Sequence, residues 1–261
     1  MYPIFLQIGP VTIYALQVFM SIGFLMALLV LNKLIQKDRD KLTFIANHSF
    51  GIFLGGLIVS RLIFVIRNVK VFFTPPFLTH FAEIFYIWDK GLSLWGGLLG
   101  IILMLTYYCG KKRQNLRSWL DIFVISVMSG LVFGNIGTFL DGRNYGRETV
   151  LPWGVLMENS RYAVPIHPVQ LYAVIYTLIL TIFLMKFLKS NFGKTAGNTA
   201  LIGGTIYAFL RFLEEFFRGD ESNYFFFFRE AQIYAAIAFI VGCVLMYRRI
   251  KSQNILKHQE V

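Results

Sequence analysis

Four charged residues lie close together in an apolar segment of the chain. The stretch FLRFLEEFFR places Arg211, Glu214, Glu215 and Arg218 within eight residues. Residues three or four apart are neighbours on a helix, so Arg211 is predicted to face Glu214 and Glu215, and Glu214 to face Arg218. A guanidinium held by carboxylates suits bidentate capture of a phosphate group. The simpler interpretation is a self-neutralising ladder at a wet helix end. Both interpretations stay open for Glu214 and Arg218, whereas for the deeper Arg211 we favour phosphate binding.

A second polar group is the stretch GNIGTFLDGRNYGRE, which has glycines at 134, 137, 142 and 146. Four glycines in thirteen residues indicate close backbone approach or non-helical backbone that faces a polar cavity. Close helix packing alone explains the first two glycines. It does not explain Asp141, Arg143 and Arg147 beside them, for which a site for a lipid headgroup is the more economical interpretation.

The third group is PIHPVQLYAV, in which Pro165 and Pro168 bracket His167. A lone histidine beside a proline at a helix start is more often a cap or a hydrogen-bonded linker than a catalyst. With Gln170 and Tyr172 alongside, His167 is also placed to orient other groups of a site.

The elements that must position these groups are predicted to be membrane helices. Hydrophobic residues make up 56% of the 261, aromatic residues 17% and charged residues only 15%. About 20 mostly apolar residues cross a bilayer as a helix, and seven stretches qualify or nearly qualify: 11–31, 43–66, 91–109, 119–140, 166–187, 200–217 and 230–247. We therefore expect an all-α integral membrane protein, with residues 1–261 forming a single transmembrane domain. A nucleic-acid binder is excluded, because no polar domain is left to carry basic patches.

The net charge of +11 is interpreted as a topology signal, because short cytoplasmic loops collect Lys and Arg. Fifteen of the 25 basic residues lie around or after the ends of the first, third, fifth and seventh stretches. This bias predicts an N-terminus outside, a C-terminus in the cytoplasm and only small caps built from the outer loops. Arg61, Arg147, His167 and Arg211 then belong to the outer half, where ionisable groups in spans are functional hypotheses by default.

Two further features have simpler interpretations. Cys109 and Cys243 lie in apolar runs away from any ligand-like cluster, so neither a disulfide nor a metal site is expected. Phe225 to Phe228 are interpreted as interfacial anchors, with Tyr224 and Arg229 at the level of the headgroups.

The order and spacing of these motifs resemble those of bacterial prolipoprotein diacylglyceryl transferases over nearly the full length. The similar segments are IGPV, SRLIFVI, WDKGLSLWGGLLG, GNIGTFLDGRNYGR, HPVQLY and FLRFLEEFFR. The resemblance implies a seven-span protein of the bacterial inner membrane whose active site faces the outer leaflet. It implies transfer of the diacylglyceryl group of phosphatidylglycerol to the lipobox cysteine of a prolipoprotein, in lipoprotein biosynthesis. The implied partners are these two substrates and the membrane lipids, with no cofactor and no metal.

The chain departs from the family pattern at several positions. The HGG motif has Trp95 in place of its histidine, and indole cannot accept a proton. Asn135 replaces an arginine, Thr138 an asparagine and Arg143 a carboxylate. Leu16 and Ile166 stand where the family has a tyrosine and an arginine. The positions that match the family are Arg61, Arg147, His167, Gln170, Tyr172, Arg211, Glu215 and Arg218.

From the resemblance we expect three groups of site residues. The catalytic group is His167, Asp141 and Arg143, with Arg143 pointing into the space left by the arginine that became Asn135. Phosphatidylglycerol or its phosphate would be bound by Arg61, Asn135, Arg147 and Arg211. The supporting group is Gln170, Tyr172, Glu215 and Arg218. The alternative is a non-catalytic or acceptor-altered homologue that binds phospholipid or lipoprotein, which the departures favour. A channel or transporter is the weakest hypothesis, because the charges gather on one side.

Overall fold

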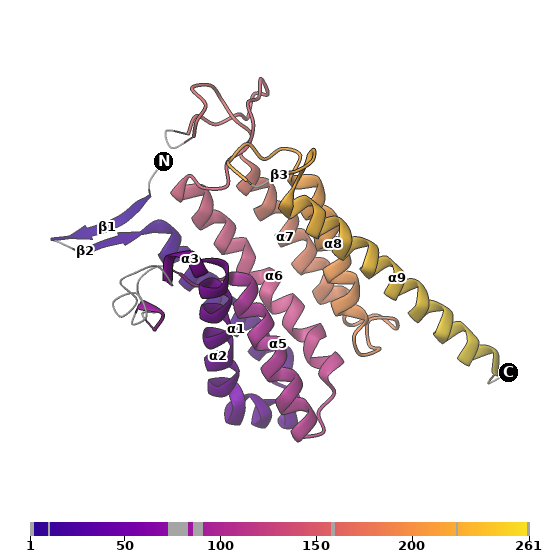
Figure 1. Ribbon diagram of the computed structural model, residues 1–261. Coiled ribbons are helices and arrows are strands. Elements are labelled where there is room, and N and C mark those ends of the chain that lie inside the picture. Colours follow the sequence, from indigo (N-terminus) through magenta and orange to yellow (C-terminus); the bar gives the residue numbers. More distant parts are fainter. Residues whose placement is uncertain are drawn as a thin grey trace. The chain divides into compact units, whose positions relative to one another are not determined.

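The computed structural model describes residues 3–9, 11–72, 83–85, 91–157, 160–222 and 224–259. It is mostly helical, as Figure 1 shows. The helices are α1 (Ala15–Ile35), α2 (Arg39–Arg67), α3 (Val69–Phe72), α5 (Leu94–Lys111), α6 (Leu116–Asp141), α7 (Val169–Phe187), α8 (Asn198–Glu214) and α9 (Glu230–Gln259). The strands form two hairpins, β1 (Ile4–Ile8) with β2 (Val11–Tyr14), and β3 (Tyr224–Phe225) with β4 (Phe228–Arg229).

Each of the seven predicted spans coincides with a long helix. Five of these, α1, α2, α6, α7 and α9, are long and apolar enough to cross a membrane, and residues 96–111 form a shorter apolar helix. Helix α8 has 17 residues and carries charges near its end. The prediction of a mostly helical multi-pass membrane protein is thereby supported, although two short hairpins are present as well. The number of seven spans and the sidedness of the termini stay predictions.

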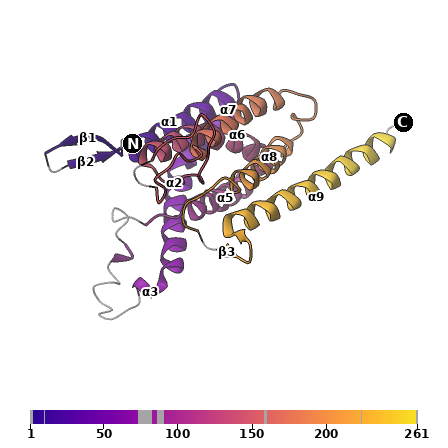
Figure 2. The same cartoon turned by 90° about the horizontal axis from the view of Figure 1, so that it is seen from above.

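The predicted start of the first helix is wrong by four residues. Residues 11–14 form strand β2, which pairs in an antiparallel manner with β1 ahead of α1 (Figure 2). Apolar residues fill both the strand and the helix, so hydrophobicity alone does not mark the boundary between them. Helix α7 also begins later than predicted, at Val169, with Pro168 as its N-cap.

The chain divides into two compact units, of which the first comprises Met1–Leu34 and Leu120–Val261. Its core is built from α1, α6 and α7, through Val30, Ile125, Met128, Leu180 and Leu184. Helices α1 and α6 approach closely at Gly23 and Gly130, which leave no room for a side chain. A Cβ on either glycine would meet the carbonyl of the other. Close packing through small residues is the typical way in which helices associate in lipid.

The helices of the first unit bring five helix ends to one place. Helices α7 and α8 are antiparallel, since Leu184 lies near Gly203 and Tyr176 near Glu214. Helix α9 runs back along α8, with Phe209 against Phe239. The C-terminal ends of α6 and α8 therefore lie at the same end of the unit as the N-terminal ends of α1, α7 and α9. We call this the site end of the first unit.

The second unit comprises Ile35–Trp119 and is dominated by the packing of α2 against α5. Glycines make this contact close, because a Cβ on Gly96 would meet the backbone of Ser60 and one on Gly100 would meet the carbonyl of Gly55. Ser93 caps α5 by accepting a hydrogen bond from the Gly96 N–H at 3.2 Å. The glycines of this segment therefore allow the close approach of α2 and α5.

Candidate functional site

The loops at the site end are tied together by their main chains. The N–H of Arg147 donates to the Phe217 carbonyl at 2.8 Å, the N–H of Gly219 donates to Tyr145 at 2.9 Å, and the N–H of His167 donates to Arg147 at 2.9 Å. A Cβ at Gly146 would meet the main chain and side chain of His167. The segments after α6, before α7 and after α8 therefore converge, and the predicted close backbone approach near Gly146 is confirmed.

The Glu215 carboxylate is the centre of the site end. It is 1% exposed and is surrounded by three guanidinium groups. Oε1 lies 2.8 Å from Nη2 of Arg211 and 3.4 Å from Nη1 of Arg218, and Oε2 lies 2.9 Å from Nε of Arg229. A buried carboxylate stays ionised at low cost only when it is paired in this way.

Asp220 forms a second acidic centre beside Glu215. Its oxygens lie 2.5 Å from Nη2 of Arg218 and 2.8 Å from Nη2 of Arg229. Burial would raise the pKa of Asp220, but the hydrogen bonds and charges of Arg218 and Arg229 hold that pKa below its ordinary value. Arg218 and Arg229 thus each bridge Glu215 and Asp220.

Arg229 is the main member of the site that the sequence interpretation missed. It was expected at headgroup level, yet it is 3% exposed and pairs with two carboxylates. The signal that could have revealed it is the excess of acids in the nearby sequence, because Arg218 alone cannot neutralise Glu215 and Asp220 together.

Glu214 was predicted to face Arg211 and Arg218, and only the first contact is present. Arg211 Nη1 pairs with Oε1 of Glu214, while the Tyr176 hydroxyl donates to Oε2 at 2.5 Å. The predicted contact with Arg218 is wrong because α8 ends at Glu214, so helical spacing no longer applies beyond it. Arg218 turns instead to Glu215 and Asp220.

Arg211 and Arg147 are both accessible to a ligand. The Arg211 side chain is 27% exposed, compared with 9% for Arg218 and 3% for Arg229. Arg147 is exposed, and its Nε donates to the Arg218 carbonyl at 3.0 Å. Within the described residues, its two Nη groups have no hydrogen-bond or ion-pair partner. This leaves the fork of Arg147 open for an anion.

His167, whose N–H is bonded to the Arg147 carbonyl, lies in a partly aromatic setting. Its Nδ1 is 3.1 Å from the Tyr172 hydroxyl, which accepts a hydrogen bond from Trp153 Nε1 at 2.8 Å. The Phe217 ring packs against the imidazole at 5.3 Å between centroids. Burial lowers the pKa of His167, so the imidazole is neutral at neutral pH. A neutral imidazole can accept a proton.

Gln170 and Arg143 connect the start of α7 to the end of α6. The Gln170 side chain is buried and donates to the Arg143 carbonyl at 2.6 Å. The Arg143 side chain is 68% exposed and pairs with the buried Asp141. Thr138 Oγ1 donates to the Asn135 carbonyl at 2.8 Å. The catalytic role of Asp141 and Arg143, and the placement of Arg143 toward Asn135, stay predictions.

Arg61 belongs to the second unit and has all three guanidinium nitrogens committed to main-chain carbonyls. Nε donates to Ile84 at 2.8 Å, Nη1 to Gly91 at 2.9 Å and Nη2 to Glu83 at 2.5 Å. The side chain is also buried against the rings of Phe64 and Phe72. Its donors fasten the segment before α5. Trp95 lies in the first turn of α5. Residues 88–90, which begin the family-like segment WDKGLSLWGGLLG, lie outside the described residues.

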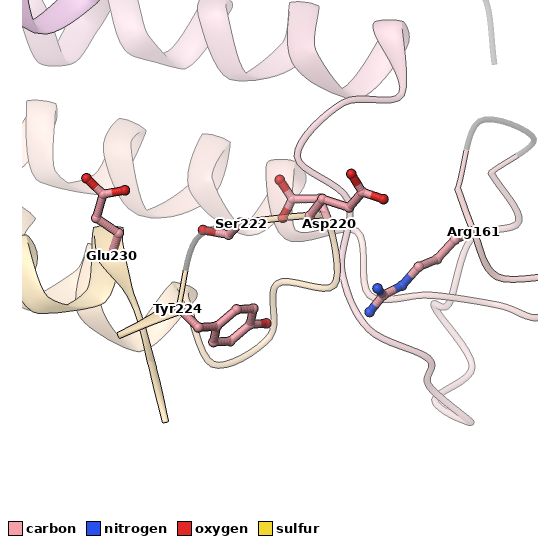
Figure 3. Close-up of a pocket in the computed structure, with 6 residues that line it drawn as sticks. Arg161, Asp220, Ser222, Tyr224 and Glu230 are labelled. Carbon is pink, nitrogen blue, oxygen red and sulfur yellow. The ribbon is translucent and has the colours of Figure 1, made fainter. Parts of the chain in front are cut away.

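An open pocket of about 650 Å³ adjoins Asp220 at the site end. Its lining residues are Arg161, Asp220, Glu221, Ser222, Tyr224 and Glu230, and Figure 3 shows Arg161 and Tyr224 extending into the same space. Three carboxylates against one guanidinium give this pocket the wrong sign for a phosphate. The pocket is therefore not suited to bind a phosphate, and the phosphate-binding role of Arg147 and Arg211 stays a prediction. In the described part of the chain, no group of His, Cys, Asp and Glu is arranged to hold a metal.

These observations define a multi-pass membrane protein with a buried arginine and carboxylate network at one end of a helix bundle. Comparison with known proteins identifies the family. The family model for prolipoprotein diacylglyceryl transferase matches residues 3–248, and the chain belongs to this family. The predicted family and transferase class are confirmed.

Several relatives cover most of the chain. A phosphatidylglycerol–prolipoprotein diacylglyceryl transferase of Clostridium tetani is 29% identical over 93% of this chain and 95% of its own length. A protein of the same name from Campylobacter hominis is 33% identical, over 76% of this chain and 71% of its own length. Another from Photobacterium profundum is 29% identical over 96% and 94%. The similarity thus extends across both compact units.

Proposed function

We propose that this protein transfers the diacylglyceryl group of phosphatidylglycerol to the lipobox cysteine of a prolipoprotein. The observation that carries the proposal is the position of Arg147 and Arg211 at the site end of a family member. Arg147 has an open fork, and Arg211 is the most exposed arginine of the buried network. Each of them offers a guanidinium fork, and such a fork is suited to bidentate recognition of a phosphate.

The reaction makes a thioether and releases glycerol phosphate. The cysteine thiol loses its proton, and the thiolate sulfur attacks the glycerol carbon that carries the phosphate ester. The carbon–oxygen bond breaks, and its electron pair leaves on the phosphate oxygen. Arg147 and Arg211 offset the charge that develops there.

His167 is the residue best suited to accept the thiol proton. The role requires the tautomer in which Nδ1–H donates to the Tyr172 oxygen, because Nε2 is then the acceptor. Trp153 donates to the same oxygen and fixes Tyr172 against the imidazole. Gln170 supports this arrangement by holding the main chain at Arg143. Asp141 keeps the proposed role of assisting the thiol, with its charge held by Arg143.

The proposed location is the bacterial inner membrane, with all seven long helices spanning and the site end facing the outer leaflet. The basic residues of the first unit support this orientation. Lys33, Lys186 and Lys189 lie at or beyond the helix ends opposite the site end, and Arg248 and Arg249 lie in the C-terminal half of α9. Cytoplasmic segments are the ones enriched in Lys and Arg. The N-terminus is then outside and the C-terminus cytoplasmic.

The transfer is tested in cells depleted of their own transferase. This chain is expressed there with a reporter lipoprotein, and the N-terminal cysteine of the reporter is examined by mass spectrometry. We expect the mass of the diacylglyceryl adduct. Absence of the adduct, with the protein inserted and folded, would reject the transfer and favour a non-catalytic homologue. The substitutions at Trp95, Asn135, Thr138 and Arg143 favour that alternative. Retained binding of phosphatidylglycerol without transfer would identify it.

A further inference from the structure

The Arg211 guanidinium pairs with two carboxylates and contacts only one oxygen of each. Nη1 pairs with Oε1 of Glu214, and Nη2 lies 2.8 Å from Oε1 of Glu215. Both carboxylates are almost fully buried, with side-chain exposures of 5% and 1%. A buried carboxylate that lost its only partner would oppose any movement of Arg211.

The second oxygen of each carboxylate has a different partner. For Glu214 this partner is the Tyr176 hydroxyl, which donates to Oε2 at 2.5 Å. For Glu215 it is Arg229, whose Nε lies 2.9 Å from Oε2. Arg229 is in turn fixed by Asp220, through Nη2 to the carboxylate at 2.8 Å and Nη1 to the carbonyl at 3.0 Å.

Exposure separates these cations by their access to a ligand. The Arg211 side chain is 27% exposed, whereas that of Arg229 is 3% exposed. Arg229 is therefore enclosed by its partners, and Arg211 can reach an anion outside the network. Three arginines face the three carboxylates of Glu214, Glu215 and Asp220, so the network is balanced before any anion arrives.

We infer that Arg211 is an exchangeable cation, and that Tyr176 and Arg229 are positioning residues that keep Glu214 and Glu215 paired when Arg211 turns to the substrate phosphate. The inference rests on the proposed phosphatidylglycerol binding. Without Arg229, Glu215 would retain only Arg218 at 3.4 Å once Arg211 left it. In a variant without Arg229, Arg211 would therefore stay paired with Glu215, and phosphate binding would weaken. Arg229 acts in this way without contacting the lipid itself.

The test is a calorimetric titration of dioctanoyl-phosphatidylglycerol into the purified full-length protein in a neutral detergent. We expect Arg229→Gln to weaken binding about tenfold, because a buried carboxylate must lose its remaining strong partner. The double variant Glu215→Gln, Arg229→Gln should bind within about threefold of the unchanged protein, because position 215 then carries no charge that would be left unpaired when Arg211 moves. A purely structural role for Arg229 would not be reversed by this second substitution.

Tyr176→Phe tests the other carboxylate and decides the matter if Arg229→Gln does not fold. It removes one hydroxyl, and we expect binding to weaken about threefold to tenfold. Arg161→Gln is the matched control, since Arg161 is exposed and its guanidinium donates to Tyr162. It should leave binding unchanged.

The outcomes separate the two proposals. If Arg211→Gln binds the lipid as tightly as the unchanged protein, the phosphate role of Arg211 fails and the inference fails with it. If Arg211→Gln weakens binding but Tyr176→Phe and the folded Arg229 variant do not, only the inference is overturned. It is also overturned if the double variant binds as weakly as Arg229→Gln alone.

Discussion

The two ends of the first unit both bury charged side chains, but they use them differently. At the end opposite the site, Asp121 is 3% exposed and accepts hydrogen bonds from the N–H groups of Gly197 at 2.5 Å and Ala200 at 2.7 Å. It thereby caps the start of α8 from a neighbouring helix. Arg249 donates to the Ala196 carbonyl beside it. Every one of these bonds ends on the main chain.

At the site end, the charged side chains pair mainly with one another. Glu215 contacts three arginines, and the carboxylates that hold Arg211 have second partners. Side chains can exchange partners without unfolding a helix end, whereas a carboxylate that caps a helix cannot leave without exposing N–H groups. The difference teaches that burial of a charge does not by itself indicate function. A functional charge is one whose partners allow it to move.

The largest effect that would sharpen this comparison is the loss of Arg211. We expect Arg211→Gln to lower kcat/KM for lipid transfer about 100-fold, a magnitude typical of losing one charge-stabilising donor. The thermal stability should change little, because Tyr176 and Arg229 still hold the two carboxylates. The measurement is transfer to a lipobox peptide at several lipid concentrations, with Arg161→Gln as the control. Activity within about threefold of the control would contradict the phosphate role.

A substitution at the opposite end should lower the stability of the protein and leave its activity unchanged. Asp121→Ala removes two hydrogen bonds to the first turn of α8, and we expect the free energy of unfolding to fall by about 2–3 kcal/mol. Unfolding in mixed detergent micelles measures this change. Transfer per folded molecule should stay the same. If the folded variant were inactive, the distinction between the two ends would be broken.

Arg61 extends the same comparison to the second unit. Its donors all end on carbonyls, so it belongs with Asp121 and not with Arg211. A lysine keeps the charge but cannot reach three carbonyls at once, and we expect Arg61→Lys to cost about 2 kcal/mol of stability. Calorimetric binding of phosphatidylglycerol should be unchanged. Weaker binding by a fully stable variant would instead support the phosphate role predicted from the family resemblance.

The sequence predicted much of the fold, because hydrophobic length marks membrane helices well. All seven long helices were expected, and so were the pairing of Arg211 with Glu214 and Glu215 and the close approach at Gly146. These features depend on local spacing or on glycine. Arg229 and Tyr176 could not be predicted, because their partners lie on other segments. Arg229 is 14 residues from Glu215 and Tyr176 is 38 residues from Glu214.

The smallest predicted effect concerns pH and the Asp220 carboxyl. Burial opposes its ionisation, but Arg218 and Arg229 hold its pKa below the ordinary value of 3.8. A carboxyl with a lower pKa in the folded state stabilises the fold above its unfolded pKa, and this contribution is lost as pH falls through the folded value. The effect should therefore appear only below about pH 4.

Asp220→Asn separates this contribution from the rest of the acid response. The asparagine can still accept hydrogen bonds from Arg218 and Arg229 but carries no charge to titrate. We expect the variant to be less stable than the unchanged protein near neutral pH, and the difference to stay constant down to about pH 4 and to shrink below that pH. Unfolding followed at each pH measures it. A difference that stays constant with pH would show that Asp220 acts through its shape and hydrogen bonds alone. At this position, the site end would then resemble the helix cap at the opposite end, where the side chain acts through fixed hydrogen bonds.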